Sequence, residues 1–157
     1  MMMRETNRNI TEIIQDMLSG DITKIRYASC EICSLSQNHE KIMELIPYQA
    51  QMMKATKNIN LGGLLAPNNR FLKKAFEIMD FYKQNQYCCP CCILGEDDNP
   101  LYLIAQGYFT LIDTVYVKDR QYIDYYIIDC NRCQNRYQVE MREYHYIWWN
   151  WTLLQTK

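Results

Sequence analysis

Apolar residues recur every three to four positions through the first half of the chain, the spacing of an amphipathic helix that buries one face. A first series predicts a helix near the N-terminus: Ile10, Ile13, Ile14, Met17 and Leu18. A second series predicts another helix soon after: Ile25, Ala28, Ile32 and Leu35. Gly20 between them favours a left-handed helix end, and Asp21 is a residue type that caps the start of the next helix.

Two further helices follow in the same half. The pattern predicts a helical stretch over residues 39–57, which Pro47 must start, kink or divide because proline lacks the backbone N–H of a helix interior. Residues 58–67, NINLGGLLAP, predict a loop, after which Asn68 or Asn69 should cap a fourth helix. The apolar stripe of that helix is Phe71, Leu72, Ala75, Phe76, Met79 and Tyr82.

The second half has the residue types of strands. Tyr, Val, Ile and Thr are frequent in four segments: residues 101–105, 108–117, 122–129 and 136–146. Gly107 and the segment 118–121, KDRQ, separate the first three. Tyr137, Val139 and Met141 alternate with polar residues, which predicts a strand with one buried face. The terminal YHYIWWNWTLL is compatible with a last strand or a short helix.

Composition changes at the same place as the pattern. Among 157 residues, 48% are hydrophobic and 22% charged, and the net charge is −1. Residues 1–86 hold most of the Met, whereas residues 87–157 hold most of the Tyr and all of the Trp. We therefore expect an α+β fold in which an antiparallel helical part, residues 1–86, packs on an antiparallel sheet, residues 87–157, as one compact unit.

The run SGDITKIRYASCEICSL combines a Gly-Asp turn, an Arg one turn into the helix and small residues at helix contacts. It resembles the helix-turn-helix unit of HEAT-type repeats, and the resemblance extends over about residues 8–57. A chain of this length leaves room for about two such units. The resemblance implies a short HEAT-like pair of helices and not a long solenoid.

Cysteine spacing indicates a metal site in the second half. Cys89 and Cys92 lie in a C-P-x-C turn, and Cys130 and Cys133 form a C-x-x-C turn just before a predicted strand. Two such turns are what a tetrahedral zinc ion with four thiolates needs, and both resemble the knuckles of zinc ribbons. Because four protein thiolates leave no open position, we expect structural Zn²⁺. An alternative register pairs Cys88 with Cys91, and the separation of the two turns exceeds that of a compact ribbon.

Two other interpretations of the cysteines remain. A redox dithiol at Cys89 and Cys92 would need the pair at a helix N-terminus after a strand, whereas the predicted order is the reverse. Unpaired thiols that simply fill the core are the other interpretation. Core filling is also what we expect of Cys30 and Cys33, which lie three positions apart in a predicted helix.

The residues that catalysis needs are sparse. His39 and His145 are the two histidines, and we expect the first to be solvated or capping and the second to pack among aromatic residues. The spacings typical of zinc proteases, nucleophile elbows, phosphate loops and dinucleotide sites do not occur. We therefore expect a chain that binds and does not catalyse.

A protein partner is the first expectation. The acidic loop GEDDNP carries Glu96, Asp97 and Asp98 in a half of charge −3, and Trp148 and Trp149 are residue types that anchor protein interfaces. In size and character the chain is similar to the small immunity proteins that bacteria pair with toxins. That resemblance implies a cytoplasmic protein that binds and neutralises a cognate toxin, such as a basic nuclease, through these residues.

A nucleic-acid-binding zinc ribbon is the second expectation, since Arg132, Arg136 and Arg142 lie near aromatic residues that could stack on bases. The net negative charge of residues 87–157 argues against a nucleic-acid site, because phosphate binding requires clustered positive charge. A thiol redox protein ranks third. No apolar run reaches the roughly 18 residues of a membrane-spanning helix. The first ten residues, MMMRETNRNI, lack the apolar stretch of a secretory signal, so a cytoplasmic location is expected.

Overall fold

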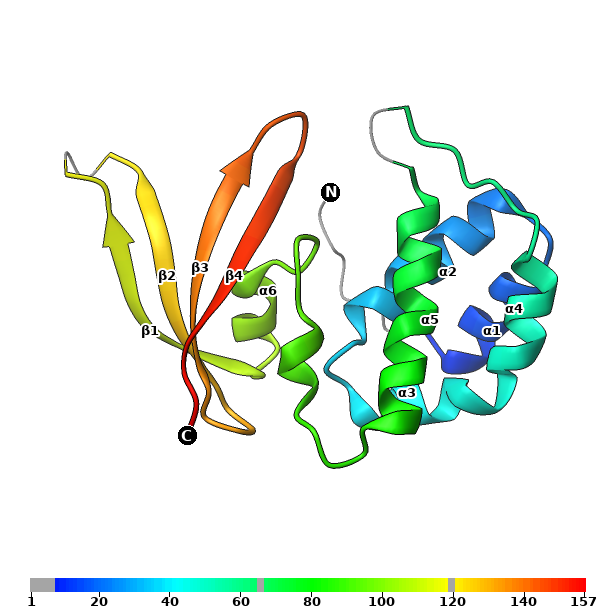
Figure 1. The fold of residues 1–157 in the computed structure, drawn as a ribbon. Helices are drawn as coiled ribbons and strands as arrows, with labels where there is room; N and C mark the ends of the chain where they lie inside the picture. The colour runs from blue at the N-terminus through cyan, green and yellow to red at the C-terminus, as the bar shows by residue number, and fades with distance from the viewer. Residues whose placement is uncertain (1–7, 65–66, 119–120) are drawn as a thin grey trace. The chain divides into compact units, whose positions relative to one another are not determined.

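The computed structural model describes residues 8–64, 67–118 and 121–157, and it confirms the α+β class: helices precede a four-stranded antiparallel sheet (Figure 1). The first seven residues, part of the 58–67 loop and part of the 118–121 segment lie outside the described residues. The chain divides into two compact units after Pro90. No helix in the described part has both the length and the apolar character to cross a membrane.

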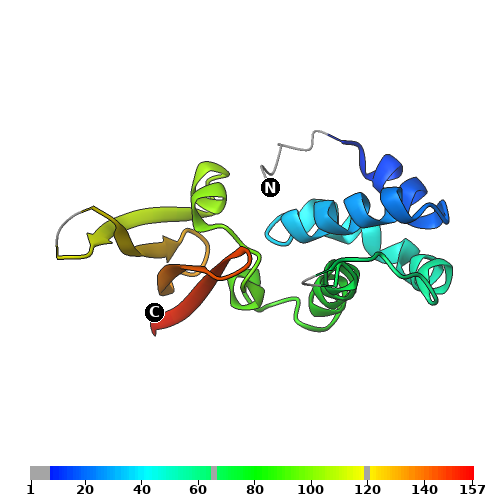
Figure 2. The same ribbon diagram turned by 90° about the horizontal axis from the view of Figure 1, so that it is seen from above.

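The first unit begins with a helical hairpin, α1 (Ile10–Leu18) and α2 (Ile22–Ser34), whose two helices lie side by side (Figure 2). Both expected turn features are present. Gly20 has a φ of 74°, a left-handed conformation that residues with a Cβ rarely adopt. The Asp21 carboxylate accepts a hydrogen bond from the Lys24 N–H at 3.1 Å and caps α2.

Pro47 divides the third helical stretch, as predicted. Helix α3 (His39–Leu45) ends two residues before it, and a 3-10 turn, η1 (Ile46–Tyr48), carries the proline at its start. Helix α4 (Gln49–Thr56) then continues. The proline has no N–H to donate, so the regular helix stops here and resumes in a new helix.

Helix α5 (Asn69–Gln84) starts where the sequence indicated, but Asn68 and Asn69 do not cap it with their side chains. Asn69 Oδ1 accepts from the Leu61 N–H at 2.7 Å, and its Nδ2 donates to the Ile59 carbonyl at 2.8 Å. Asn68 Nδ2 donates to the Leu61 carbonyl at 3.0 Å. The two amides therefore fix the preceding loop, whose backbone groups have no partner in a helix or sheet.

The core of the helical unit is rich in Met and Ile. Its members are fully buried and come from all five helices: Met17, Ile25, Ile32, Ile42, Leu45, Met52 and Met79. Tyr82 adds a buried polar contact, since its hydroxyl donates to the Ser36 carbonyl at 2.7 Å. Met17, Ile25, Ile32, Met79 and Tyr82 belong to the apolar stripes that the sequence pattern indicated, whereas Ile42, Leu45 and Met52 lie in the stretch for which only a helix was predicted.

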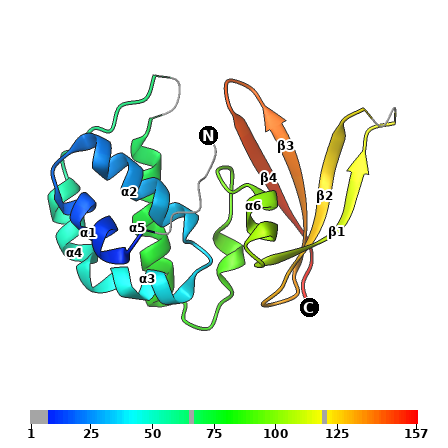
Figure 3. The same ribbon diagram turned by 180° about the vertical axis from the view of Figure 1, so that it is seen from behind.

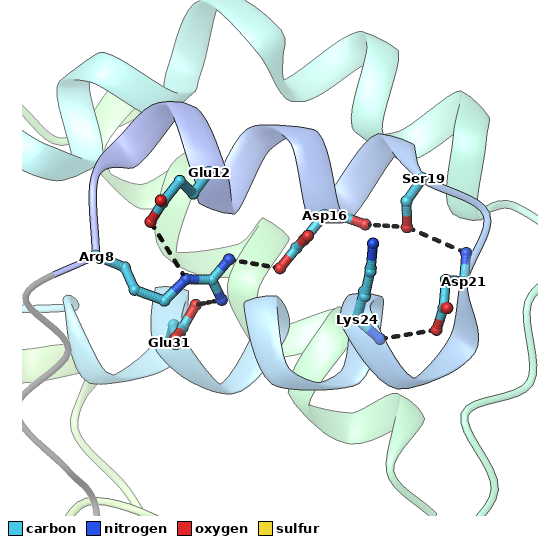
Figure 4. Close-up of polar contacts among 7 residues, drawn as sticks. All are labelled: Arg8, Glu12, Asp16, Ser19, Asp21, Lys24 and Glu31. Atoms are coloured by element: carbon cyan, nitrogen blue, oxygen red, sulfur yellow. Dashed lines mark hydrogen bonds and ion pairs between the residues drawn. The ribbon is translucent and has the colours of Figure 1, made fainter.

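Arg8 links the first two helices through carboxylates on both. Its guanidinium lies 2.9 Å from Glu31 on α2 and 2.5 Å from Asp16 on α1, with Glu12 at 3.6 Å (Figure 4). The Glu31 side chain is 11% exposed. Burial raises the pKa of Glu31 above its usual value, and the Arg8 charge and hydrogen bond oppose that rise. Arg8 thus neutralises a partly buried carboxylate.

A 3-10 turn, η2 (Pro90–Ile93), spans the boundary between the units, and a short helix, α6 (Pro100–Ala105), follows in the second unit. The predicted strand over residues 101–105 was therefore wrong. Asn99 caps this helix by accepting from the Leu101 N–H at 2.9 Å, and Pro100 occupies its first turn. Asn followed by Pro is a helix-start signal that overrides the strand-like composition of LYLIA.

The sheet has the strand order β1-β2-β3-β4, so each strand pairs with its neighbour in sequence (Figure 3). The strands are β1 (Phe109–Tyr116), β2 (Ile123–Cys130), β3 (Arg136–Glu143) and β4 (Ile147–Gln155). The last of these settles the terminal Trp-rich segment as a strand. Gly107, with a φ of 79°, ends the turn after α6 as expected of a separator.

The two faces of the sheet differ. The inner face carries the buried core residues, which share a side by strand alternation and pairing: Phe109, Tyr126, Ile128, Tyr137, Val139 and Trp149. The outer face carries charged pairs, Arg136 with Asp129 at 2.7 Å and Arg142 with Glu140 at 2.6 Å. Hydrogen bonding from Arg136 lowers the pKa of Asp129, and hydrogen bonding from Asn150, then Arg142, lowers that of Glu140.

Replacing Arg8 with Ala should lower the free energy of unfolding by about 1–2 kcal/mol at pH 7, because Glu31 loses its buried cationic partner. The pKa of Glu31 should then rise further, and a raised carboxyl pKa destabilises the folded state only while the group is ionised. The difference in free energy of unfolding between the variant and the wild type should therefore shrink as the pH falls through the pKa of Glu31. Urea unfolding of the full chain at several pH values measures this.

Lys73→Ala is the matched control, since Lys73 pairs with Glu77 at 3.6 Å while both side chains are mostly exposed. This variant should unfold almost as the wild type does. Equal losses in the two variants, or a deficit in Arg8→Ala that does not depend on pH, would contradict the role assigned to Arg8.

Candidate metal centre

Four cysteines converge, two of them on either side of Pro90 and two in the turn between β2 and β3. The Sγ atoms of Cys89, Cys91, Cys130 and Cys133 all lie within 4.8 Å of one another. Cys91 and Cys130 are buried, each 2% exposed, whereas Cys89 and Cys133 are half-buried. Sulfurs from two segments far apart in sequence thus surround one point, from which solvent is partly excluded.

The turn between β2 and β3 holds Cys130 and Cys133. Cys130 donates its N–H to the Asn135 carbonyl at 2.9 Å, and its own carbonyl accepts from the Gln134 N–H at 2.8 Å. Gln134 has a φ of 65°, so the chain turns back within four residues. The second C-x-x-C pair therefore lies in a hairpin turn, as the sequence indicated.

Asn131, inside this turn, ties it to the start of β1. Its backbone N–H donates to the Tyr108 carbonyl at 3.0 Å, and its Nδ2 donates to the Gly107 carbonyl at 2.8 Å. Thr110 Oγ1 donates to Asn131 Oδ1 at 2.6 Å. These bonds orient the two sulfurs without using the cysteine side chains, and they give Asn131 a structural role that the sequence pattern did not indicate.

The first cysteine segment contributes Cys89 and Cys91, and not the pair Cys89 and Cys92 that we favoured. The 3-10 turn that begins at Pro90 places Cys91 on the buried side and Cys92 at the surface. The two sulfurs of this segment therefore come from residues i and i+2, on either side of Pro90, and not from residues i and i+3 as in a zinc knuckle. The alternative pair was Cys88 with Cys91; Cys88 is exposed as well, so only Cys91 of that pair belongs to the cluster.

Tyr137 on β3 contacts the cluster from the protein core. Its hydroxyl oxygen lies 3.2 Å from Cys91 Sγ, and its side chain is buried. The ring packs edge-on against Trp151 at 5.7 Å and Phe109 at 6.2 Å between centroids. Burial raises the pKa of Tyr137, and Cys91 raises it further, so the phenol stays protonated and can donate to the sulfur.

The donor set and its spacing fit a tetrahedral metal ion. Sulfurs bound at about 2.3 Å to one tetrahedral ion lie about 3.8 Å apart. Cys91 Sγ and Cys133 Sγ are 3.5 Å apart, and no pair in the cluster exceeds 4.8 Å. Four cysteines supply four ligands, so a bound ion would have no open position for water or substrate.

Two further cysteines lie in helix α2 of the first unit. Cys33 is buried and its Sγ lies 3.3 Å from the Phe71 carbonyl oxygen, whereas Cys30 is half-buried. This placement between α2 and α5 agrees with the core-filling role expected of the pair.

The residues expected to contact a partner have different surroundings. Glu96 is exposed and Asp97 half-buried, but Asp98 is buried, and its carboxylate accepts from the Gly95 N–H at 2.7 Å. Trp148 is half-buried and Trp149 is 8% exposed. Asp98 and Trp149 therefore have structural contacts, and Glu96 presents the exposed carboxylate of this loop.

This acidic loop runs along the outer edge of β4. The Trp149 N–H donates to the Glu96 carbonyl at 2.9 Å, and the Trp151 indole N–H donates to the Asp98 carbonyl at 3.1 Å. The tryptophans thus fix the loop backbone. His145, expected to pack, is exposed, and its ring lies tilted against that of the neighbouring Tyr144, 4.0 Å between centroids, while His39 lies exposed at the start of α3.

Comparison of the chain with family models, curated proteins and solved structures finds no match. The resemblances to HEAT repeats, zinc ribbons and immunity proteins therefore stay predictions.

A pair of single substitutions tests which cysteine of the first segment binds metal. Cys91→Ser should lose bound metal and lower the melting temperature, because a buried sulfur ligand is removed. Cys92→Ser should keep both, since the exposed Cys92 lies outside the cluster. Metal content by elemental analysis and thermal unfolding measure the two effects. Loss of metal in Cys92→Ser together with full metal content in Cys91→Ser would contradict this ligand set and would favour Cys89 and Cys92 as the ligands.

Proposed function

We propose that the chain is a non-catalytic protein-binding protein whose sheet is stabilised by a structural zinc ion, and that it acts as an immunity protein against a basic toxin. The observation that carries the proposal is the convergence of four cysteine sulfurs within 4.8 Å of one another. Such a cluster fixes a rigid surface, and its complete set of protein ligands serves structure and not catalysis.

Zinc is the metal that suits these ligands best. Four thiolates in tetrahedral arrangement select zinc or an iron–sulfur centre, and mutual distances below 4.8 Å leave room for one ion and not for a cluster of iron and sulfide. The bound ion would join the η2 segment to the β2–β3 turn. Since such a site has no counterpart in the unfolded chain, the binding free energy of zinc would stabilise the fold.

A protein partner agrees with the charges of the second unit. Of the three arginines that a nucleic-acid site would use, Arg136 and Arg142 are paired with carboxylates on the outer face of the sheet, and Arg132 is exposed in the β2–β3 turn. The exposed Glu96 lies on a loop that backbone hydrogen bonds from β4 hold in place. A fixed carboxylate attracts a basic partner over long range and speeds association, which suits the neutralisation of a toxin.

Tyr137→Phe tests the contact between phenol and sulfur. This variant keeps the buried ring but loses the hydrogen bond to Cys91, and it should weaken zinc binding roughly tenfold or more, as loss of such outer contacts does. Tyr125→Phe on the opposite face of β2–β3 is the control and should bind zinc normally. Competition with a chromophoric chelator gives both affinities, and equal affinities would contradict the role of Tyr137.

The product of the gene next to its own is the partner to test first. The purified zinc-loaded chain should bind that protein and restore the growth of cells that express it. Glu96→Lys should slow association, because it reverses the exposed charge of the loop, whereas Glu44→Lys on α3 should not. Calorimetry, association rates and growth measure this.

Absence of binding together with no growth rescue would overturn the immunity role. A salt-dependent shift of random DNA or RNA by the same sample would replace the protein partner with a nucleic acid.

A further inference from the structure

The two hairpins of the sheet separate toward their tips. Strands β2 and β3 pair only between residues 125–129 and residues 136–140. Beyond that point β1–β2 pairing continues to Tyr116 and Ile123, and β3–β4 pairing continues to Glu143 and Ile147. The hairpins diverge in Figure 1 at this end, opposite the turn that carries Cys130 and Cys133. The first two residues of β2 and the last three residues of β3 therefore do not pair with each other's strand.

Exposed apolar side chains lie on the inner face of this stretch. Met141 and Ile147 continue the inner face of β3 and β4 by alternation, yet they are 48% and 55% exposed. Val139, two residues before Met141 on the same face, is fully buried. The apolar pattern of the core face thus extends beyond the part of the sheet that the unit covers.

The inner face here also carries two exposed carboxylates. Asp124 on β2 and Glu143 on β3 are exposed, and within the described residues neither forms an ion pair with Lys or Arg. On the outer face, by contrast, Asp129 and Glu140 each have an arginine partner. Both arginines of the strands face outward, so positive charge on the strands is confined to that side.

We propose that this open end of the sheet, lined by Asp124, Met141, Glu143 and Ile147, binds an extended basic segment of the partner protein. The inference rests on the proposed protein-binding function and specifies its surface. Backbone groups of the separated strands can pair with an extended chain. All four side chains share the inner face, so every second residue of that chain meets them: apolar residues can pack on Met141 and Ile147, and Lys or Arg can pair with Asp124 and Glu143.

A second copy of the chain fits this surface less well. The second half carries a net charge of −3, so another copy would bring more negative charge against Asp124 and Glu143. A basic extended segment satisfies the strand edges, the apolar residues and the charges together.

A synthetic peptide of about nine residues is a direct probe if every second residue is in turn Lys or Val and Thr stands between them, since a strand of that length then presents Lys and Val on one face. Two control peptides replace Lys with Glu or Val with Ser. Fluorescence anisotropy should show that the zinc-loaded chain binds the Lys/Val peptide, more weakly as salt rises, and prefers it to both controls. Backbone amides of residues 123–124 and 141–143 should gain protection from hydrogen exchange in that complex.

The variant with Asp124→Asn and Glu143→Gln should bind the peptide roughly tenfold more weakly while it keeps its metal and melting temperature. Met141→Gln with Ile147→Gln should weaken binding as well. Glu40→Gln with Glu44→Gln removes the same charge from α3 and should leave affinity unchanged.

Equal affinity in all variants, or protection from exchange confined to other strands, would overturn the proposed binding surface. A dimer in sedimentation that the Met141→Gln, Ile147→Gln variant no longer forms would overturn it as well, because a second copy would then occupy this surface. If the chain binds its protein partner but none of these residues matters, the surface fails and the proposed function stands. If the partner does not bind while the peptide binds at this surface, the immunity role fails and the surface stands.

Discussion

The convergence of four cysteine sulfurs is the constraint on which the second unit depends. Cys91 precedes the sheet and Cys130 ends its second strand, so the cluster closes a loop that contains α6 and the first hairpin. Closing a loop of this length costs chain entropy, and thiols alone offer little attraction to offset it. A bound ion would supply the missing attraction, and folding of this unit would then depend on metal.

The remainder of the unit supports that cluster from two sides. Asn131 ties the β2–β3 turn to the start of β1, and Tyr137 connects Cys91 with the aromatic core of the inner face. Toward the opposite end the sheet receives less cover, its middle strands separate, and apolar residues reach the surface. The cysteine cluster and the separated strands therefore lie at opposite ends of the sheet.

Much of the helical unit could be predicted from sequence, because its signals are local. Gly20, Asp21 and Pro47 act through their own backbone and nearest neighbours, and the structure agrees with each of them. Residues 101–105 misled the prediction because Leu, Tyr and Ile suit a strand as well as a helix, while the decisive Asn99–Pro100 start was overlooked. A capping role was expected of Asn68 or Asn69, but their amides bind the backbone of a loop seven to ten residues before them.

The metal centre was predictable in part for the same reason. Cys130 and Cys133 follow a local turn rule, whereas the choice between Cys91 and Cys92 depends on how the turn at Pro90 faces a distant strand. The central claim is that four sulfurs bind a single ion. X-ray absorption at the zinc edge of the purified, metal-loaded chain tests it most directly. The account predicts one shell of four sulfurs at about 2.3 Å; a shell that contains nitrogen or oxygen ligands, or fewer sulfurs, would contradict it.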